Sequence, residues 1–173
     1  MREKFTTEKV GNVFLFSFLL LTTGCLTPAV RYSSTGPAQT QKLRTAQESA
    51  QPDKLQQVVE SYLGTPYRYG EKSRSGIDCS GFVSTVFRKV YDLQLPHSSK
   101  KIREYGVRVS LRRARPGDLV FFRGGYLRRI NHVGIYMGEG RFIHASSSRG
   151  VIYSELEEEY YKRRFAEIRR VNP

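Results

Sequence analysis

The sequence predicts an α+β domain in which helices come first and an antiparallel sheet follows. Two observations predict this class. Apolar residues recur at the helical period between residues 82 and 91, and short apolar runs separated by glycine-containing turns follow between residues 119 and 171. Consecutive short strands joined by tight turns are typical of an antiparallel sheet. A chain of 173 residues can hold one such domain and additional segments.

The first 24 residues have the pattern of a secretory signal, with basic residues before an apolar run. That run is shorter than the roughly 20 residues of a membrane-spanning helix. The residues Leu21-Thr22-Thr23-Gly24-Cys25 resemble a bacterial lipobox, which implies that Cys25 is lipidated and becomes the first mature residue. Two or more acyl chains, such as palmitate, give stable anchoring. Because Leu26 follows, analogy with lipoprotein sorting favours the outer membrane, facing the periplasm. The alternative is an ordinary signal peptide or a short anchor helix.

The next segment, residues 25–52, predicts a flexible tether that follows the lipidated cysteine. It is rich in proline, serine, threonine and glutamine and has few large apolar residues. The folded domain is predicted over residues 53–173. It opens with a helix that ends at Gly64. The apolar residues expected on one face of this helix are Leu55, Val58, Val59, Tyr62 and Leu63.

The second cysteine, Cys79, lies where a loop gives way to a predicted helix. Asp78 or Ser80 can cap the first turn of that helix. Cys79 is then beside unpaired backbone N–H groups at the positive end of the helix dipole, which predicts a lowered thiol pKa. The alternative is a buried structural cysteine.

Two predicted strands, residues 131–137 and 141–145, each carry one histidine. The residues between them predict a three-residue hairpin loop over 138–140. With that loop, His132 and His144 share one face of the sheet as diagonal neighbours about 7–8 Å apart. A two-residue loop would change the parity and separate them. Either histidine alone could be structural.

A cysteine with a paired base is the arrangement that acyl transfer requires. We assign Cys79 as the nucleophile, His132 as the general base and acid, and His144 as the group that orients His132. Tyr67 and the backbone N–H of Cys79 can donate to the oxyanion. A zinc site on the same three residues is the alternative. No acidic residue accompanies them in a metal motif, so neither a metal nor another cofactor is expected.

These motifs together give the chain from about 53 to 171 a family resemblance. It resembles the NlpC-type cell-wall peptidases, a bacterial papain-like cysteine peptidase family, through these segments: Gly64-Thr65-Pro66-Tyr67, Asp78-Cys79-Ser80-Gly81-Phe82-Val83, Pro116-Gly117-Asp118-Leu119-Val120-Phe121-Phe122, His132-Val133-Gly134-Ile135-Tyr136 and Phe142-Ile143-His144-Ala145. The resemblance implies a papain-like core in which a catalytic cysteine begins a helix packed on the antiparallel sheet. It places the family's catalytic residues on Cys79, His132 and His144, and its active-site tyrosine on Tyr67. It also implies hydrolysis of peptidoglycan stem peptides.

The bond that is cut depends on residues that line the substrate groove. In stem-cutting relatives the residues that match Asp78 and Ser80 bind a free substrate amine, which favours the bond between γ-D-glutamate and diaminopimelate. The alternative is the D-Ala–diaminopimelate crosslink, which becomes possible if Asp78 only caps the helix. The chain departs from the family at His97, where arginine is common after Leu-Pro. The other classes considered are acyl transfer on the same scaffold and a catalytically silent envelope lipoprotein.

The chain is strongly basic, with a formal net charge of +13. Its basic residues are scattered and no nucleic-acid motif accompanies them, so no nucleic-acid partner is expected. An acidic polymer or an anionic membrane surface accounts for the charge. The expected partners are peptidoglycan stem peptides and, through Cys25, a membrane of the bacterial cell envelope. The chain is expected to act as a monomer.

Overall fold

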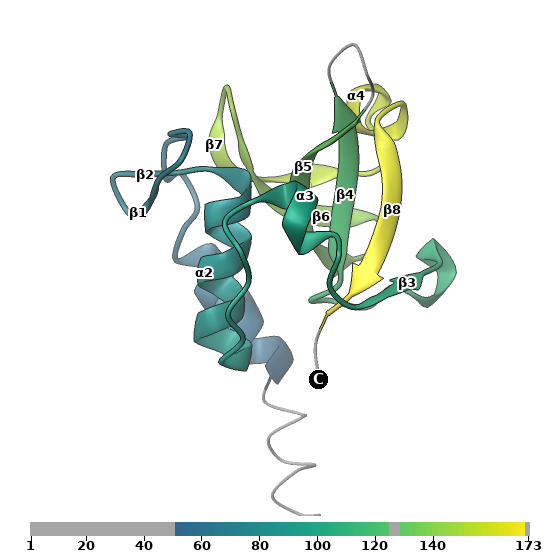
Figure 1. Cartoon of the computed structure of the whole chain (residues 1–173), viewed down its shortest axis with the longest axis horizontal. Coiled ribbons are helices and arrows are strands. Elements are labelled where there is room, and N and C mark those ends of the chain that lie inside the picture. Colours follow the sequence, from purple (N-terminus) through teal and green to yellow (C-terminus); the bar gives the residue numbers. More distant parts are fainter. Residues whose placement is uncertain (1–50, 125–128, 172–173) are drawn as a thin grey trace, which may run out of the picture. The chain divides into compact units, whose positions relative to one another are not determined.

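The computed structural model describes residues 51–124 and 129–171 (Figure 1). The predicted signal segment, Cys25 and nearly all of the predicted tether lie outside these residues. The described chain begins within a helix, residues 51–60, whose Leu55 and Val59 are fully buried. Leu63, expected on the same apolar face, is 45% exposed. Within the described ranges, no helix is long and apolar enough to cross a membrane.

The predicted central helix is confirmed as α2 (Cys79–Tyr91). It begins at Cys79 because the Asp78 carboxylate accepts the Gly81 N–H at 2.7 Å and so satisfies a donor in the first turn. It ends at Asp92, which adopts a left-handed conformation with φ 54° and donates its N–H to the Phe87 carbonyl. The predicted apolar face is buried, and it includes Phe82, Val83, Val86, Phe87 and Val90.

The predicted antiparallel sheet is also confirmed, with six strands in the order β3-β8-β4-β5-β6-β7. Their bounds are β3 (Val107–Val109), β4 (Leu119–Gly124), β5 (Arg129–Gly138), β6 (Arg141–Ser146), β7 (Gly150–Glu155) and β8 (Phe165–Arg170). A separate small ribbon, β1 (Lys72–Ser73) and β2 (Gly76–Ile77), leads directly into α2. The short helical elements are α3 (Ser99–Ile102), η1 (Leu111–Arg113) and α4 (Glu159–Lys162).

Both faces of the sheet are covered, so alternate residues of β4 enter two different apolar clusters. Phe121 packs in the larger cluster with Phe82 and Phe87 of α2. Phe122 packs in the smaller cluster, which also holds Tyr161 of α4. Successive side chains of a strand point to opposite faces, and burial on both faces explains the unbroken apolar run of β4. Figure 1 shows α2 on one side of the sheet and α4 near the start of β8.

Candidate active site

Cys79 is the first residue of α2 and is 7% exposed. It belongs to the apolar cluster that joins α2 to the sheet, together with Val133 of β5. The backbone N–H groups of Val133, of Ser80 and of Cys79 itself lie near the sulfur and lower the pKa of the thiol. Val133 directly follows His132, so the sulfur lies against the strand that carries the expected base.

The expectation of a lowered pKa for Cys79 is wrong. Burial raises the pKa of the thiol to about 11, and the nearby Asp78 carboxylate adds to the rise. The three backbone N–H groups act in the opposite direction, but they do not outweigh the loss of solvation. The resting thiol is therefore protonated at neutral pH, and it needs a base to become a nucleophile.

The hairpin between β5 and β6 differs from the predicted one. Its turn contains two residues, Glu139 and Gly140, both with positive φ (52° and 76°), and Gly138 pairs with Arg141. The register then shifts between Tyr136 and Gly138, where a bulge adds one residue to β5. The bulge restores the parity that the shorter turn removes. Beyond it the predicted pairing of Ile135 with Ile143 is confirmed.

The restored register brings the two histidines together. His132 Nε2 lies 2.7 Å from His144 Nδ1, and the two rings are nearly perpendicular at 88°. Gly134 makes this approach possible, because a Cβ at that position would lie 2.8 Å from the Phe142 ring and 3.1 Å from His144 Cβ. The prediction that both histidines share one face is confirmed.

Burial keeps both imidazoles neutral at pH 7. It lowers the pKa of His132 to about 4. It lowers the pKa of His144 to about 2, with smaller contributions from the charges of His132 and Arg149. A neutral imidazole has one donor nitrogen and one acceptor nitrogen, so the bond between the two rings fixes complementary tautomers.

Two hydroxyl groups that the sequence did not indicate hold the far side of His144. The Tyr161 hydroxyl lies 3.0 Å from His144 Nε2, and the Ser154 hydroxyl lies 3.3 Å from the same atom. If His144 donates its Nε2–H to these oxygens, its Nδ1 accepts from His132 Nε2–H. His132 Nδ1 is then free to accept a proton. No spacing or motif points to Tyr161, which lies 17 residues beyond His144.

Tyr67 lines the same cavity as the two histidines. A parallel bridge with Ile77 fixes its position, since Ile77 donates its N–H to the Pro66 carbonyl. Burial raises the pKa of the Tyr67 hydroxyl, and the Cys79 and Asp78 charges raise it further. The hydroxyl therefore stays protonated at neutral pH and can donate a hydrogen bond.

Asp78 and Ser80 are buried and lie outside the residues that line this cavity. The first carboxylate oxygen of Asp78 accepts from the Gly81 N–H and the Ser80 hydroxyl. The second lies 2.8 Å from the Gly70 nitrogen and 2.8 Å from His97 Nε2. These contacts lower the pKa of Asp78 although burial alone would raise it. These contacts agree with a role of Asp78 as the cap of α2. Amine binding by Asp78 and Ser80 stays a prediction.

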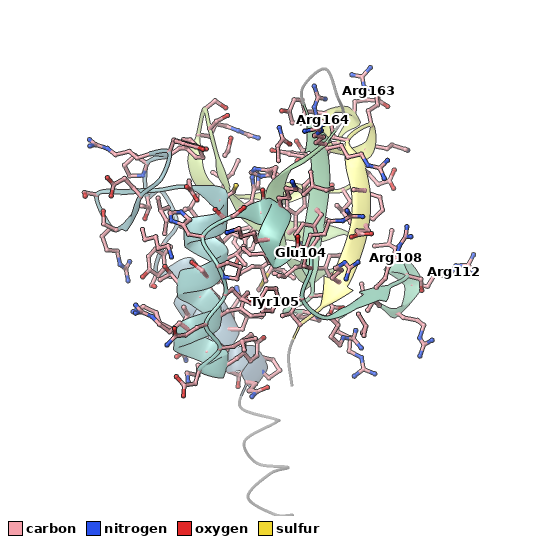
Figure 2. The ribbon with its side chains drawn as sticks, viewed as in Figure 1. Glu104, Tyr105, Arg108, Arg112, Arg163 and Arg164 are labelled. Carbon is pink, nitrogen blue, oxygen red and sulfur yellow. The ribbon has the colours of Figure 1, made fainter. Side chains whose placement is uncertain are left out.

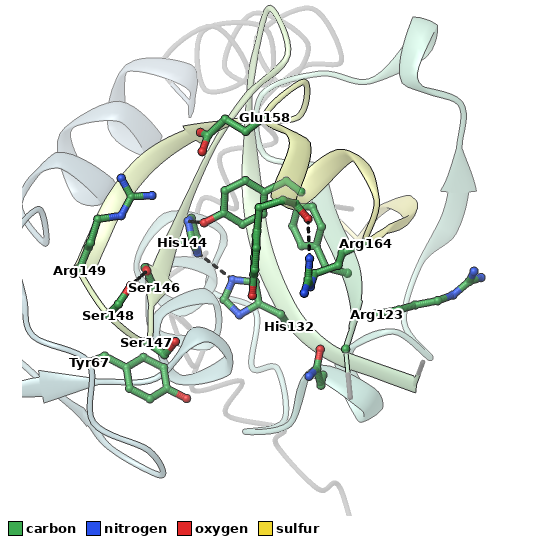
Figure 3. A pocket seen from close by; sticks show the side chains of 15 residues that line it. Tyr67, Arg123, His132, His144, Ser146, Ser147, Ser148, Arg149, Glu158 and Arg164 are labelled. Atoms are coloured by element: carbon green, nitrogen blue, oxygen red, sulfur yellow. Dashed lines mark hydrogen bonds between the residues drawn. The ribbon is translucent and has the colours of Figure 1, made fainter. Parts of the chain in front are cut away.

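The cavity has a volume of about 530 Å³ and opens beside the histidine pair (Figure 3). Its wall combines Tyr67, His132 and His144 with three arginines, Arg123, Arg149 and Arg164, and with Glu158. Over residues 51–124 and 129–171, no group of three or more histidine, cysteine, aspartate or glutamate side chains is arranged to hold a metal ion.

A thiol at the start of a helix, packed on an antiparallel sheet that carries a hydrogen-bonded histidine pair, is the arrangement of the papain-like class of cysteine peptidases. Residues 64–170 match the NlpC/P60 family, and the chain belongs to this family. The predicted papain-like α+β fold is confirmed by solved structures. A crystal structure of an NlpC/P60 family protein from Bacillus cereus ATCC 10987 superposes with a TM-score of 0.66 at 31% identity, covering 70% of this chain and 40% of that chain.

Two curated relatives from Escherichia coli strain K12 are similar over the same region. The protein named "Probable endopeptidase NlpC" is 44% identical over 117 residues, which cover 68% of this chain and 76% of that protein. The protein named "Murein DD-endopeptidase MepS/Murein LD-carboxypeptidase" is 46% identical over 122 residues, which cover 69% of this chain and 64% of that protein. The match therefore spans slightly less than two thirds of the second relative.

Proposed function

We propose that this chain is a cysteine endopeptidase that hydrolyses peptide bonds in peptidoglycan stem peptides. The observation that carries the proposal is the contact between the Cys79 sulfur and β5 directly after His132, whose ring is bonded to His144. The two histidines border a cavity that can admit a peptide. The names of the two curated relatives support an endopeptidase of the cell wall.

The proposed reaction proceeds through a thioester. As the Cys79 sulfur attacks the carbonyl carbon, His132 takes the thiol proton, and His144 holds the imidazolium in place. Tyr67 and the Cys79 backbone N–H donate to the oxyanion. The intermediate then collapses, and the leaving amine takes the proton from His132. A water molecule, deprotonated by His132, attacks the thioester and releases a carboxylate and the free thiol.

For the bond that is cut, we favour the D-Ala–diaminopimelate crosslink. The preference for the γ-D-glutamyl bond depended on an Asp78 carboxylate open to a substrate amine, and here both of its oxygens already accept two hydrogen bonds each. The relative that is 46% identical is named a murein DD-endopeptidase. The γ-D-glutamyl–diaminopimelate bond remains the second candidate, because Tyr67 lies in the cavity wall as the stem-cutting pattern requires.

The test is mass spectrometry of products from two defined substrates, a free-amine tripeptide stem and a crosslinked dimer. We expect the purified chain to cleave the dimer and the Cys79→Ala variant to cleave neither substrate. Cleavage of the tripeptide alone would reverse the choice of bond. A transfer product in place of hydrolysis would indicate acyl transfer. If the chain cuts no bond, the silent-lipoprotein alternative holds and the enzyme proposal fails.

We further propose that residues 1–24 are removed and that acyl chains on Cys25 anchor the enzyme to the outer membrane, facing the periplasm. The lipobox resemblance of residues 21–25 supports this proposal. The following residues, up to about 52, would then tether a monomeric domain beside the cell wall. Incorporation of labelled palmitate and fractionation of membranes test the anchor. Equal labelling of the wild type and Cys25→Ser would refute it.

A further inference from the structure

The arginines around β8 are paired with carboxylates inside the fold. Arg103 and Arg169 both bond to Glu167, at 2.6 Å and 2.9 Å. Arg170 forms a two-pronged contact with Asp118, in which Nε and Nη2 each lie 2.8 Å from a carboxylate oxygen. Both acids are buried, so these arginines have a structural role and their charge is neutralised locally.

The arginines of the cavity differ from that group. Among the described residues, Arg123, Arg149 and Arg164 form no ion pair with a carboxylate, although all three line the cavity beside the catalytic histidines. The single acid in the described cavity wall, Glu158, accepts the backbone N–H of Glu155. The cavity therefore has an excess of positive charge, which favours an anionic group in a bound molecule.

Arg164 is the cavity arginine that is held most firmly. Its guanidinium carbon lies 3.8 Å from the centre of the Tyr160 ring, and its Nη1 donates to the Tyr160 carbonyl at 3.2 Å. The side chain is half-buried, and most of its five N–H donors have no partner within the described part of the chain. A guanidinium that is already oriented loses little entropy when it binds a carboxylate.

The arrangement around the histidines separates Arg164 from Arg149. Figure 3 shows the two arginines on either side of the His132 and His144 rings. Arg149 is exposed on the turn between β6 and β7, and Arg123 is exposed on β4. Neither side chain makes a hydrogen bond with a described residue, so they add to the field of the cavity without presenting a fixed fork of donors.

We propose that Arg164 is the anchor for a substrate carboxylate that lies beside the scissile amide. This inference rests on the proposed function but does not depend on which bond is cut. A γ-linked D-glutamate retains its α-carboxylate on the α-carbon, which two methylene groups separate from the amide carbonyl. A crosslinked diaminopimelate retains a carboxylate on the carbon that bears the amide nitrogen. In both cases the anion lies within a few bonds of the reacting carbon, where a cation in the wall beside His132 can reach it.

Binding to the full chain carrying Cys79→Ala tests the anchor, since the peptides then stay intact. The probes are the crosslinked dimer, the tripeptide stem, and analogues in which the carboxylate beside the scissile amide is a carboxamide. We expect Arg164→Gln to weaken binding of the better carboxylate peptide by about 10- to 100-fold, the range of a charge-assisted hydrogen bond. Binding of the matching carboxamide should change little. Arg164→Lys should fall in between, because it keeps the charge and loses the fork.

The matched control is Arg112→Gln, which removes an equal charge from an exposed position on η1, on a different element from Arg164 (Figure 2). It should leave binding unchanged. Any of three outcomes would overturn the proposal. Both glutamine variants could weaken peptide binding equally, Arg164→Gln could weaken binding of the acid and amide peptides equally, or no probe could bind. Thermal unfolding checks that Arg164→Gln is folded. If it is not, the proposal is tested by Arg164→Lys and by comparing how the carboxylate and carboxamide peptides bind when Arg164 is present.

Cleavage by the chain with Cys79 intact separates the two proposals. Arg164-dependent binding without cleavage would refute the endopeptidase function and leave the carboxylate anchor in place. Cleavage of acid and amide peptides with equal kcat/KM, unaffected by Arg164→Gln, would refute the anchor and leave the endopeptidase function in place.

Discussion

His132 and His144 lie on adjacent strands with 2.7 Å between Nε2 of the first ring and Nδ1 of the second. Behind His144, the hydroxyl groups of Tyr161 and Ser154 face its Nε2 atom. The chain of contacts thus continues from β5 through β6 to α4 and β7. It ties the orientation of the proposed base to a helix that follows the sheet hairpins in the sequence.

Tyr161→Phe tests this chain of contacts. Removing the hydroxyl leaves the His144 Nε2–H with only the longer contact to Ser154, and a buried donor without a good partner costs about 1–3 kcal/mol. We expect kcat for peptide cleavage to fall about 10-fold or more while KM stays near the wild-type value, because the phenyl ring still packs the wall. Steady-state kinetics on the defined stem peptides provide the measurement.

The control for that variant is Tyr105→Phe, which removes an exposed hydroxyl outside the cavity. Adding Ser154→Ala to Tyr161→Phe should lower kcat further, since no described partner for His144 Nε2 then remains. A Tyr161→Phe enzyme with unchanged kcat would show that the hydroxyl does not orient the histidine pair.

On the acid side, kcat/KM should fall at a pH well below the pKa of an ordinary histidine. His132 accepts a proton only when it is neutral, and burial lowers its pKa to about 4. As the pH falls, kcat/KM should therefore stay level through pH 6.5, where a solvent-exposed imidazole becomes charged, and drop near pH 4. A drop centred near pH 6.5 would contradict a desolvated base. Arg112→Gln, which removes an exposed charge outside the cavity, should show the same profile.

The alkylation of Cys79 by iodoacetamide should lack a plateau at neutral pH. Because burial raises the thiol pKa to about 11, the thiolate fraction should keep growing as the pH rises past 8.5, the value of an unperturbed thiol. Mass spectrometry of the peptide that contains Cys79 measures the rate at each pH. A plateau reached below pH 7 would instead indicate a resting thiolate paired with a charged His132.

Gly134→Ala should disable the site through packing alone. The added Cβ would lie 2.8 Å from the Phe142 ring, 3.0 Å from the Ile143 carbonyl oxygen and 3.1 Å from His144 Cβ. Overpacking of this kind costs about 1–3 kcal/mol. We expect a lower unfolding midpoint and a loss of activity larger than the loss of folded protein, because His144 must move. An enzyme that stays fully active when folded would contradict the close approach.

Local patterns in the sequence determined the helix and the strands that carry the site. The helical period of the apolar residues predicted α2, and the cap that Asp78 supplies lies only three residues from the N–H that it accepts. The period of two along β5 and β6 placed His132 and His144 on one face. The motifs around Cys79, His132 and His144 identified the family, since each motif lies within a few consecutive residues.

The tertiary structure decided the properties that depend on distant groups. The predicted three-residue hairpin was wrong, yet the face of the histidines was right because a bulge compensated for the shorter turn. Backbone pairing with β6, which no local pattern of β5 encodes, selects that bulge. The contact of Tyr161 with His144 spans 17 residues, and that of His97 with Asp78 spans 19.

The charge state of Cys79 belongs to the same class of property. The start of a helix favours a thiolate through nearby backbone N–H groups, and that argument needs only the local sequence. Packing of α2 against β5 then removes water from the sulfur, and desolvation outweighs the local N–H groups. The sequence by itself predicted the residues that we propose carry the chemistry, whereas only the folded environment decided their protonation, because solvation depends on all the groups that surround an atom.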